Sequence, residues 1–121
     1  EALEVAALFG LRDRAHAPAR ELPQGDKKLL DVASAFTLRP DIILLDEPTS
    51  GVSTADKHVV MEILVGAAKK IGLRAIIQVE HDMDIVFGYS DRIVALHQGT
   101  VLADTTPEGA ESPTLLVART R

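Results

Sequence analysis

The feature that most constrains the fold is an apolar run that ends in two adjacent acids. Residues 42–53 read Ile-Ile-Leu-Leu-Asp-Glu-Pro-Thr-Ser-Gly-Val-Ser. Four aliphatic residues in a row, with Pro40 before them and Pro48 after them, predict a short strand buried on both faces, as in the middle of a parallel sheet. Ligands bind at the carboxyl ends of such strands, so Asp46 and Glu47 lie where chemistry is expected.

Adjacent acids at a strand end can perform different tasks, because successive side chains of an extended segment point to opposite sides. One carboxylate can hold a Mg²⁺ ion while the other orients or deprotonates an attacking water, and phosphoryl transfer needs little more. Taken alone, however, an Asp-Glu-Pro sequence is more often a polar turn that ends a strand. The neighbouring segments decide between these two interpretations.

Composition limits the classes of function. The 121 residues are 46% hydrophobic and 26% charged, as in one globular domain with a core of its own. Aromatic residues make up 3% and the net charge is −5, which argues against base-stacking platforms and against binding to a nucleic-acid backbone. The absence of cysteine excludes disulfides and thiolate metal sites and fits a reducing compartment.

No apolar run approaches the roughly 20 residues that span a bilayer, and no basic-then-apolar signal sequence opens the chain. We therefore expect a soluble chain. Because it begins at Glu1 without an initiator methionine, we also expect a fragment or an excised domain.

Three helices are predicted before residue 75. Residues 1–9 are rich in helix formers and are followed by Gly10. A second helix follows residues 21–28, and its apolar face is formed by Leu29, Val32, Ala33 and Phe36. A third begins at Ser-Thr-Ala-Asp, residues 53–56, which matches a capping box, and ends at Gly72. The apolar face of this crossover helix comprises Val60, Ile63, Leu64, Ala67 and Ile71.

Gly25 and Asp26 fall at the start of the second helix. Free backbone N–H groups and the helix dipole make such an end an anion or phosphate site, and Gly25 would let a phosphate approach closely. The alternative interpretation is a helix-capping turn in which Asp26 interacts with the dipole, and for these residues alone it is the better one.

A second buried strand is predicted at residues 75–79, followed by Glu80-His81-Asp82. A strand–helix–strand order with this connection length implies a parallel pair, which brings His81 to the same sheet edge as Asp46 and Glu47. An imidazole there can donate to a terminal phosphate or hold a water, although most histidines are surface or capping residues.

The rest of the chain predicts a short helix, a hairpin and a tail. The helix covers residues 84–89, and strands at 92–96 and 101–103 form an antiparallel hairpin. Pro107, Gly109 and Pro113 break any longer element, and the segment from Thr114 is expected to be frayed or a short helix with a solvated end at Arg119 and Arg121.

Together these segments resemble the C-terminal half of the nucleotide-binding subunit of ABC transporters, over nearly the whole chain. Residues 42–47 resemble the Walker B strand, which implies Mg²⁺ binding by Asp46 and catalysis by Glu47. Residues 22–26 stand in place of the Leu-Ser-Gly-Gly-Gln signature loop, which contacts ATP on the partner subunit. Residues 50–53 correspond to the D-loop, and His81 to the switch histidine.

The resemblance implies an α/β fold of the P-loop NTPase type with parallel strands, crossover helices and a C-terminal hairpin. Residues 1–24 would end the helical subdomain and include the signature loop, residues 25–104 would form the C-terminal part of the ATPase core, and residues 105–121 a tail. The implied nucleotide-contacting residues are Gln24, Gly25, Asp26, Ser50 and Ser53. The segments Gly-Asp, Glu-His-Asp-Met and Leu-His-Gln-Gly are most similar to the branched-chain amino acid and urea importer group.

Two features of the sequence depart from the family pattern. Pro23 replaces the signature serine and Gln24 the first signature glycine, so a hydroxyl donor to the terminal phosphate is lost. Hydrolysis at this site is expected to be reduced or lost even in a complete protein, unless Gln24 supplies a donor. The 121 residues also contain no Gly-x-x-x-x-Gly-Lys-[Ser/Thr] phosphate loop. We therefore expect the isolated chain neither to bind ATP tightly nor to hydrolyse it.

Absence of the phosphate-loop strand affects the predicted sheet as well. In the family fold that strand lies between the strands at residues 75–79 and 92–96, so its absence leaves two unpaired edges. We expect self-association, strand exchange or rearrangement of the isolated chain.

Three hypotheses follow. The first is a fragment of a transport ATPase that uses ATP and Mg²⁺, dimerises with a second ATP-binding subunit, and lies on the cytoplasmic face of the membrane through permease subunits. The second is a non-catalytic dimerisation or interaction module derived from such an ATPase. The third is a Mg²⁺-dependent phosphohydrolase that uses Asp46, Glu47, His81 and Asp82 without a phosphate loop.

Overall fold

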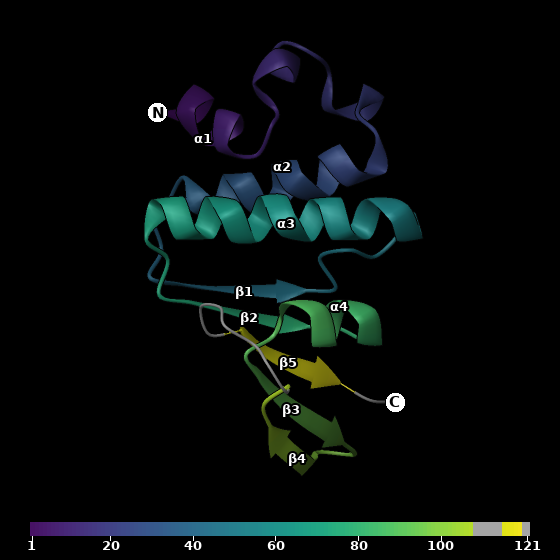
Figure 1. Ribbon diagram of the computed structural model, residues 1–121. Coiled ribbons are helices and arrows are strands. Elements are labelled where there is room, and N and C mark those ends of the chain that lie inside the picture. Colours follow the sequence, from purple (N-terminus) through teal and green to yellow (C-terminus); the bar gives the residue numbers. More distant parts are fainter. Residues whose placement is uncertain (108–114, 120–121) are drawn as a thin grey trace. The chain divides into compact units, whose positions relative to one another are not determined.

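The computed structural model describes residues 1–107 and 115–119. The chain forms two compact units, one of Glu1–Pro40 with Thr49–Gly72 and the other of Asp41–Pro48 with Leu73–Arg121 (Figure 1). The first unit is helical and the second contains the sheet. The predicted α/β class is confirmed, because helices and parallel strands alternate along the chain.

The helical unit comprises three α-helices and two single turns of 3₁₀ helix. They are α1 (Ala2–Leu8), η1 (Arg12–Arg14), η2 (Ala19–Glu21), α2 (Gln24–Phe36) and α3 (Thr54–Ile71). The four predicted apolar residues of α2 are all buried. Phe36, the last of them, packs edge to face against Phe9, with ring centroids 5.0 Å apart and an interplanar angle of 87°. This aromatic pair joins the segment after α1 to the end of α2.

The ends of α3 are fixed by the residues that the sequence indicated. The Ser53 hydroxyl accepts a hydrogen bond from the Asp56 backbone N–H at 3.2 Å and donates to the Asp56 carboxylate at 2.6 Å. At the other end Gly72 has a φ of 79°, and its N–H donates to the carbonyls of Ala68 and Lys69. The capping-box prediction and the glycine stop are therefore confirmed.

The sheet unit has five strands in the order β1-β2-β5-β3-β4 (Figure 1). The strands are β1 (Ile42–Asp46), β2 (Ala75–Val79), β3 (Arg92–His97), β4 (Thr100–Thr105) and β5 (Leu115–Arg119). A short helix, α4 (Met83–Tyr89), connects β2 to β3. Strands β1 and β2 pair in parallel at five positions, from Ile42 opposite Ala75 to Asp46 opposite Val79. The predicted parallel pair is confirmed.

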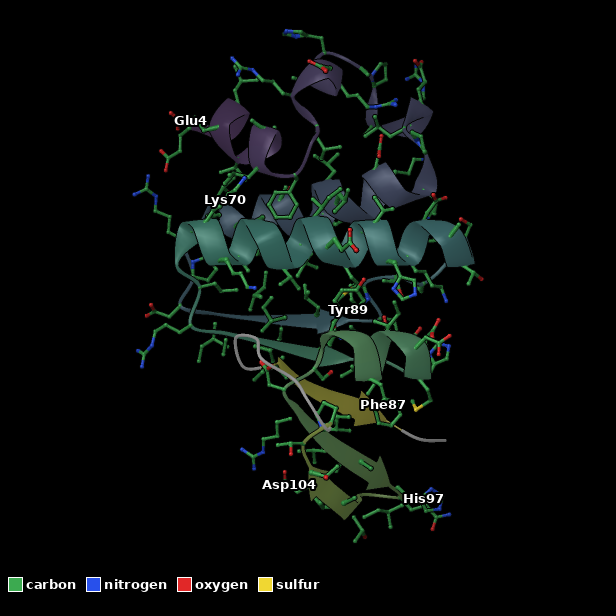
Figure 2. The ribbon with its side chains drawn as sticks, viewed as in Figure 1. Glu4, Lys70, Phe87, Tyr89, His97 and Asp104 are labelled. Atoms are coloured by element: carbon green, nitrogen blue, oxygen red, sulfur yellow. The ribbon has the colours of Figure 1, made fainter. Side chains whose placement is uncertain are left out.

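The predicted hairpin is also confirmed. Strands β3 and β4 are antiparallel, and Gln98 and Gly99 between them have φ values of 46° and 78°, as a two-residue turn with two positive φ angles requires. Arg92 of β3 donates two hydrogen bonds to Asp104 of β4, from Nε at 2.9 Å and from a terminal nitrogen at 2.6 Å. Figure 2 labels Asp104 on β4.

The prediction for the C-terminal segment was wrong at residues 115–119. These residues form strand β5, which pairs in parallel with both β2 and β3 (Figure 1). The segment is extended because two neighbouring strands supply the partners for its backbone, and such non-local pairing leaves no mark in the local sequence pattern. Strands β2 and β3 are not neighbours, as expected, but the expectation of two unpaired edges between them was wrong, because β5 lies there and pairs with both strands. Gly109, Pro113, Thr114 and Arg121 lie outside the described residues.

The prediction that residues 42–45 are buried on both faces was also wrong. Ile43 is 6% exposed, whereas Ile42 and Leu44 are 51% and 73% exposed. These exposures alternate along β1, so the strand has one buried face and one exposed face. A continuous aliphatic run identified the strand correctly but did not establish that its second face is covered.

Candidate functional site

The two acids lie at the carboxyl end of β1, as expected. Asp46 is the last residue of the strand and is exposed. Glu47 follows it with a φ of 47°, and its N–H donates to the carbonyl of Val79 at 2.8 Å. That hydrogen bond extends the β1–β2 pairing by one residue. Glu47 is therefore held in a backbone conformation that side-chain-bearing residues rarely adopt, which is common at functional sites.

His81 reaches this end of the sheet from the neighbouring strand. It follows β2 by two residues, and its Nδ1 lies 3.1 Å from Oε1 of Glu47. The His81 and Glu47 side chains are 63% and 40% exposed, so the pair is open to solvent. With a proton on Nδ1, the imidazole donates and the carboxylate accepts. The expected meeting of the acid and the imidazole at one sheet edge is confirmed geometrically.

Asp82, which the third hypothesis includes, has a local structural contact. Its Oδ1 accepts a hydrogen bond from the backbone N–H of Asp84 at 3.2 Å, which caps the start of α4. This contact fixes the turn directly after His81. Asp82 thereby helps to define the direction in which the chain leaves the site.

The donor set fits a Mg²⁺ ion shared with phosphate better than a metal held by protein alone. In residues 1–107 and 115–119, no three His, Asp or Glu side chains are grouped as metal ligands. Asp46 supplies an exposed carboxylate next to Glu47. Mg²⁺ in nucleotide sites is usually bound by one or two carboxylates, with substrate phosphates and water completing the shell.

The predicted signature loop and D-loop residues come together in the helical unit. A Cβ atom at Gly51, which has a φ of 75°, would lie 3.6 Å from Nε2 of Gln24. One at Gly25 would lie 3.5 Å from Cγ2 of Val60. The start of α2 therefore packs against both the D-loop segment and α3. Pro23 is the N-cap residue of α2 and has no side-chain hydrogen bond, as expected for a residue without a hydroxyl.

Three polar side chains predicted to contact nucleotide already have protein partners. Ser50 accepts a hydrogen bond from Nζ of Lys28 at 3.0 Å. Asp26 forms an ion pair with Arg14, with Nε 3.0 Å from Oδ2. Ser53 caps α3. The geometry thus gives each of them a contact within the protein.

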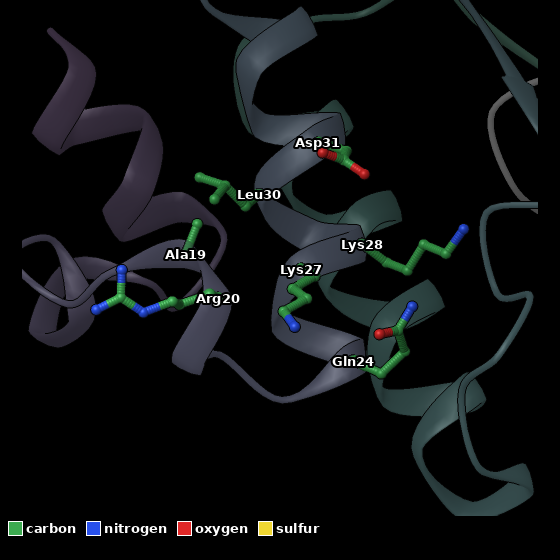
Figure 3. Close-up of a pocket in the computed structure, with 7 residues that line it drawn as sticks. All are labelled: Ala19, Arg20, Gln24, Lys27, Lys28, Leu30 and Asp31. Atoms are coloured by element: carbon green, nitrogen blue, oxygen red, sulfur yellow. The ribbon is translucent and has the colours of Figure 1, made fainter.

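Sequence reasoning missed Lys28 and the pocket beside it. A cavity of about 420 Å³ is lined by Ala19, Arg20, Gln24, Lys27, Lys28, Leu30 and Asp31 (Figure 3). Three cations and one acid line it, so it is basic. The signal available in the sequence was the Lys-Lys pair directly after Gly-Asp, because it places two cations on the first turns of a helix whose N-terminus also carries positive partial charge.

Comparison with known proteins gives a consistent picture. No protein-family model matches the sequence. The chain is 38% identical over 112 residues to the high-affinity branched-chain amino acid transport ATP-binding protein LivG of Salmonella typhimurium, a match that covers 89% of this chain and 44% of LivG. It is 34% identical over 108 residues to a putative ABC transporter ATP-binding protein of Methanosarcina acetivorans, which covers 89% of this chain and 32% of that protein.

Two solved structures share the fold. CbiO1 of Clostridium perfringens, part of the ABC transporter complex CbiONQ, has a TM-score of 0.82 and 29% identity, covering 88% of this chain and 43% of that one. A dimeric bacterial ABC transporter cassette has a TM-score of 0.71 and 26% identity, covering 90% and 47%. The chain thus spans less than half the length of the relatives that it matches. Within residues 1–107 and 115–119, no helix combines the length and hydropathy needed to cross a bilayer.

Proposed function

From homologues that are ABC transporter ATP-binding proteins, we propose that this chain is the C-terminal part of such a subunit and carries its hydrolytic residues. The observation that carries the proposal is the contact between Glu47 and His81 at the carboxyl end of β1, 3.1 Å between Oε1 and Nδ1. Two strands of a parallel sheet deliver an acid pair and an imidazole to one edge, as a nucleotide-hydrolysing site requires.

Each residue has a task that follows from its chemistry. Asp46 would hold a Mg²⁺ ion, which supplies positive charge that stabilises the charge developing on the transferred phosphoryl group. Glu47 accepts hydrogen bonds from a water and orients or deprotonates it. His81 uses Nδ1 for Glu47, so Nε2 is the ring atom that would face the terminal phosphate. Nε2 donates there only when the ring carries its second proton.

We propose the solute and the partner subunits of the full-length protein from the same relatives. LivG is named for branched-chain amino acid transport, and we propose that the full-length protein serves the transport of a solute of that class. The alternative solute is urea. A dimeric cassette is among the related structures, which supports pairing with a second ATP-binding subunit. Permease subunits at the cytoplasmic face of the membrane complete the proposed assembly.

The test is a Glu47→Gln substitution in the full-length protein. The amide keeps the size of the side chain but cannot act as a base, so we expect hydrolysis to fall by about 10²–10³-fold while Mg-ATP stays bound. Asp41→Asn is the matched control, since it makes the same chemical change at the other end of β1. Turnover unchanged by Glu47→Gln would remove Glu47 from the proposed role.

A second function, a non-catalytic interaction module, is favoured by one observation at the start of α2. Pro23 stands where the family has serine and makes no capping hydrogen bond, so a donor to the partner-bound phosphate is lost. If this function is right, Pro23→Ser in the full-length protein leaves ATP hydrolysis at background. If the ATPase function is right, the same substitution raises hydrolysis, and a dimerisation assay shows whether both variants assemble equally.

A further inference from the structure

The basic cavity beside Lys28 shares no lining residue with the group formed by Asp46, Glu47 and His81. Its lining comes from η2 and from the N-terminal part of α2. Its volume of about 420 Å³ falls within the range of small-molecule sites, roughly 300–1,000 Å³. The cavity can therefore take a small organic ligand, and the charges of its lining residues indicate which kind.

Lys27 and Asp31 line this cavity one helical turn apart. Opposite charges four positions apart can pair on a helix surface, although lysine before the acid is the less favourable order. Within residues 1–107 and 115–119, however, neither of these side chains has an ion-pair or hydrogen-bond partner. Lys27 is also half-buried. One cavity thus offers a ligand both a cation and an acid.

The other two cations of the cavity differ in their contacts. Nζ of Lys28 donates to the Ser50 hydroxyl at 3.0 Å, so this ammonium group already has a protein partner. A terminal nitrogen of Arg20 lies 3.6 Å from Oε1 of Glu21, but the two side chains are 82% and 61% exposed, and such a pair contributes little. Arg20 and Lys27 are therefore the cations that a carboxylate in the cavity would meet.

The cavity also has an apolar side, formed by Ala19 and Leu30. Figure 3 shows Leu30 extending toward Ala19. In the same view Leu30 and Asp31 extend to opposite sides of α2, and Lys27 lies between them, nearer the start of the helix (Figure 3). An apolar surface, an acid and a cation are thus arranged around one cavity, as three different groups on a single carbon atom require.

We propose that this cavity binds a free α-amino acid with an aliphatic side chain. Lys27 and Arg20 bind the carboxylate of the ligand, Asp31 binds its ammonium group, and Leu30 contacts its side chain. A simple anion would be repelled by Asp31, and a simple amine would meet three cations. A zwitterion uses both charges of the cavity. The site does not depend on the proposed ATPase function, because none of the proposed hydrolytic residues lines it.

Three ligands of similar size test the site by their charges. L-Leucine carries both charged groups, 4-methyl-2-oxopentanoate lacks the ammonium group, and 3-methylbutylamine lacks the carboxylate. Each ligand is titrated with the 121-residue chain at neutral pH, and binding is measured by saturation-transfer difference NMR. We expect L-leucine to bind about tenfold more tightly than either analogue. Absence of leucine binding, or an analogue that binds as tightly as leucine, would overturn the proposal.

Two substitutions assign the ligand's charges to residues of the cavity. Lys27→Gln should weaken the binding of leucine and of the oxo acid, because both carry the carboxylate. Asp31→Asn should weaken leucine binding about tenfold and leave the oxo acid bound as well or better, because it removes a repulsion. Neither side chain has a partner within the described residues, so both variants should keep the wild-type circular dichroism spectrum.

Lys70→Gln is the matched control for the loss of a positive charge. Lys70 is exposed in the last turn of α3 and does not line the cavity. We expect this variant to bind leucine like the wild type. Leucine binding that survives both cavity substitutions, an equal loss in Lys70→Gln, or an Asp31→Asn variant that loses both ligands equally would overturn the proposal.

Discussion

At the scale of single residues, Glu47 combines a chemical role with backbone strain. Its φ of 47° is unfavourable for any residue with a Cβ atom by roughly 1–2 kcal/mol. Glycine removes that strain but raises the entropy of the unfolded chain. In urea titrations we expect the free energy of unfolding of the Glu47→Gly variant to be about 0.5–1 kcal/mol higher than that of the Glu47→Ala variant. Both variants lack the carboxylate.

The matched control is the same pair of substitutions one residue earlier. Asp46 lies within β1, where an extended backbone suits any side chain, so Asp46→Gly should be less stable than Asp46→Ala. If the glycine variant were less stable than the alanine variant at both positions, the conformation of Glu47 would store no strain. If the protein becomes more stable when Glu47 is replaced by glycine, the strained backbone at Glu47 is kept for the site and not for stability.

The chemistry-bearing residues were more predictable than their contacts. Asp46, Glu47 and His81 could be brought to one edge from sequence, because parallel strands present their carboxyl ends together. Lys28 could not be paired with Ser50, which is 22 positions away, because a long side chain reaches many partners and local spacing does not select one. The ion pair of Asp26 with Arg14 was missed for the same reason.

At the scale of secondary-structure elements, the cap of α3 makes a simple prediction. Ser53 accepts the hydrogen bond from the Asp56 N–H, and its replacement by alanine leaves that donor without its partner. We expect Ser53→Ala to lower the free energy of unfolding by about 1 kcal/mol in urea titrations. Ser34→Ala is the control, because Ser34 is exposed inside α2 and bonds only a carbonyl of its own helix. Equal effects of the two substitutions would contradict a capping role.

The β3–β4 hairpin should respond to acid. The hydrogen bonds from Arg92 lower the pKa of Asp104 below its ordinary value of 3.8. Because the pKa of Asp104 is lower in the folded chain than in the unfolded chain, the ion pair stabilises the hairpin at pH values above the unfolded-state pKa. This stabilisation is lost as the pH falls through the lowered folded-state pKa. Because the pair is exposed, the effect should be small and should weaken in salt.

Hydrogen exchange measured by NMR tests this prediction. Protection of the β4 amides, corrected for intrinsic exchange rates, should decrease on moving from pH 6 to pH 3. The Asp104→Asn variant should show a lower protection at pH 6 and little further change. A wild-type hairpin with constant protection over this range would show that the ion pair contributes nothing.

Elements with strong local signals were predicted well, and the element set by distant partners was not. Helix α3 has a capping serine, a periodic apolar face and a terminal glycine, and the strands β1 and β2 are short aliphatic runs between turn residues. Strand β5 has an equally short aliphatic sequence, Leu-Leu-Val. Its conformation depends on whether an open position exists between β2 and β3, which is a property of the sheet and not of residues 115–119.

At the scale of the whole molecule, the exposed face of β1 and β2 bears on association between copies. Leu44 lies beside Ile77, and Val79 beside Asp46, so these side chains share one face. Leu44 is 73% exposed and Val79 39% exposed. Parallel sheets are normally covered on both faces, and an exposed apolar strand face favours contact with another copy.

We therefore expect the 121-residue chain to self-associate and Leu44→Gln to reduce that association. Size-exclusion chromatography with light scattering should give a mass above 13.0 kDa for the wild type at micromolar concentrations and a mass nearer to 13.0 kDa for the variant. The melting temperature should change little, because Leu44 is largely exposed already. Ile43→Gln, on the buried face, should instead unfold the sheet. If Leu44→Gln left the mass unchanged, association would have to proceed through another surface, and the edges of β1 and β4 would be the next to test.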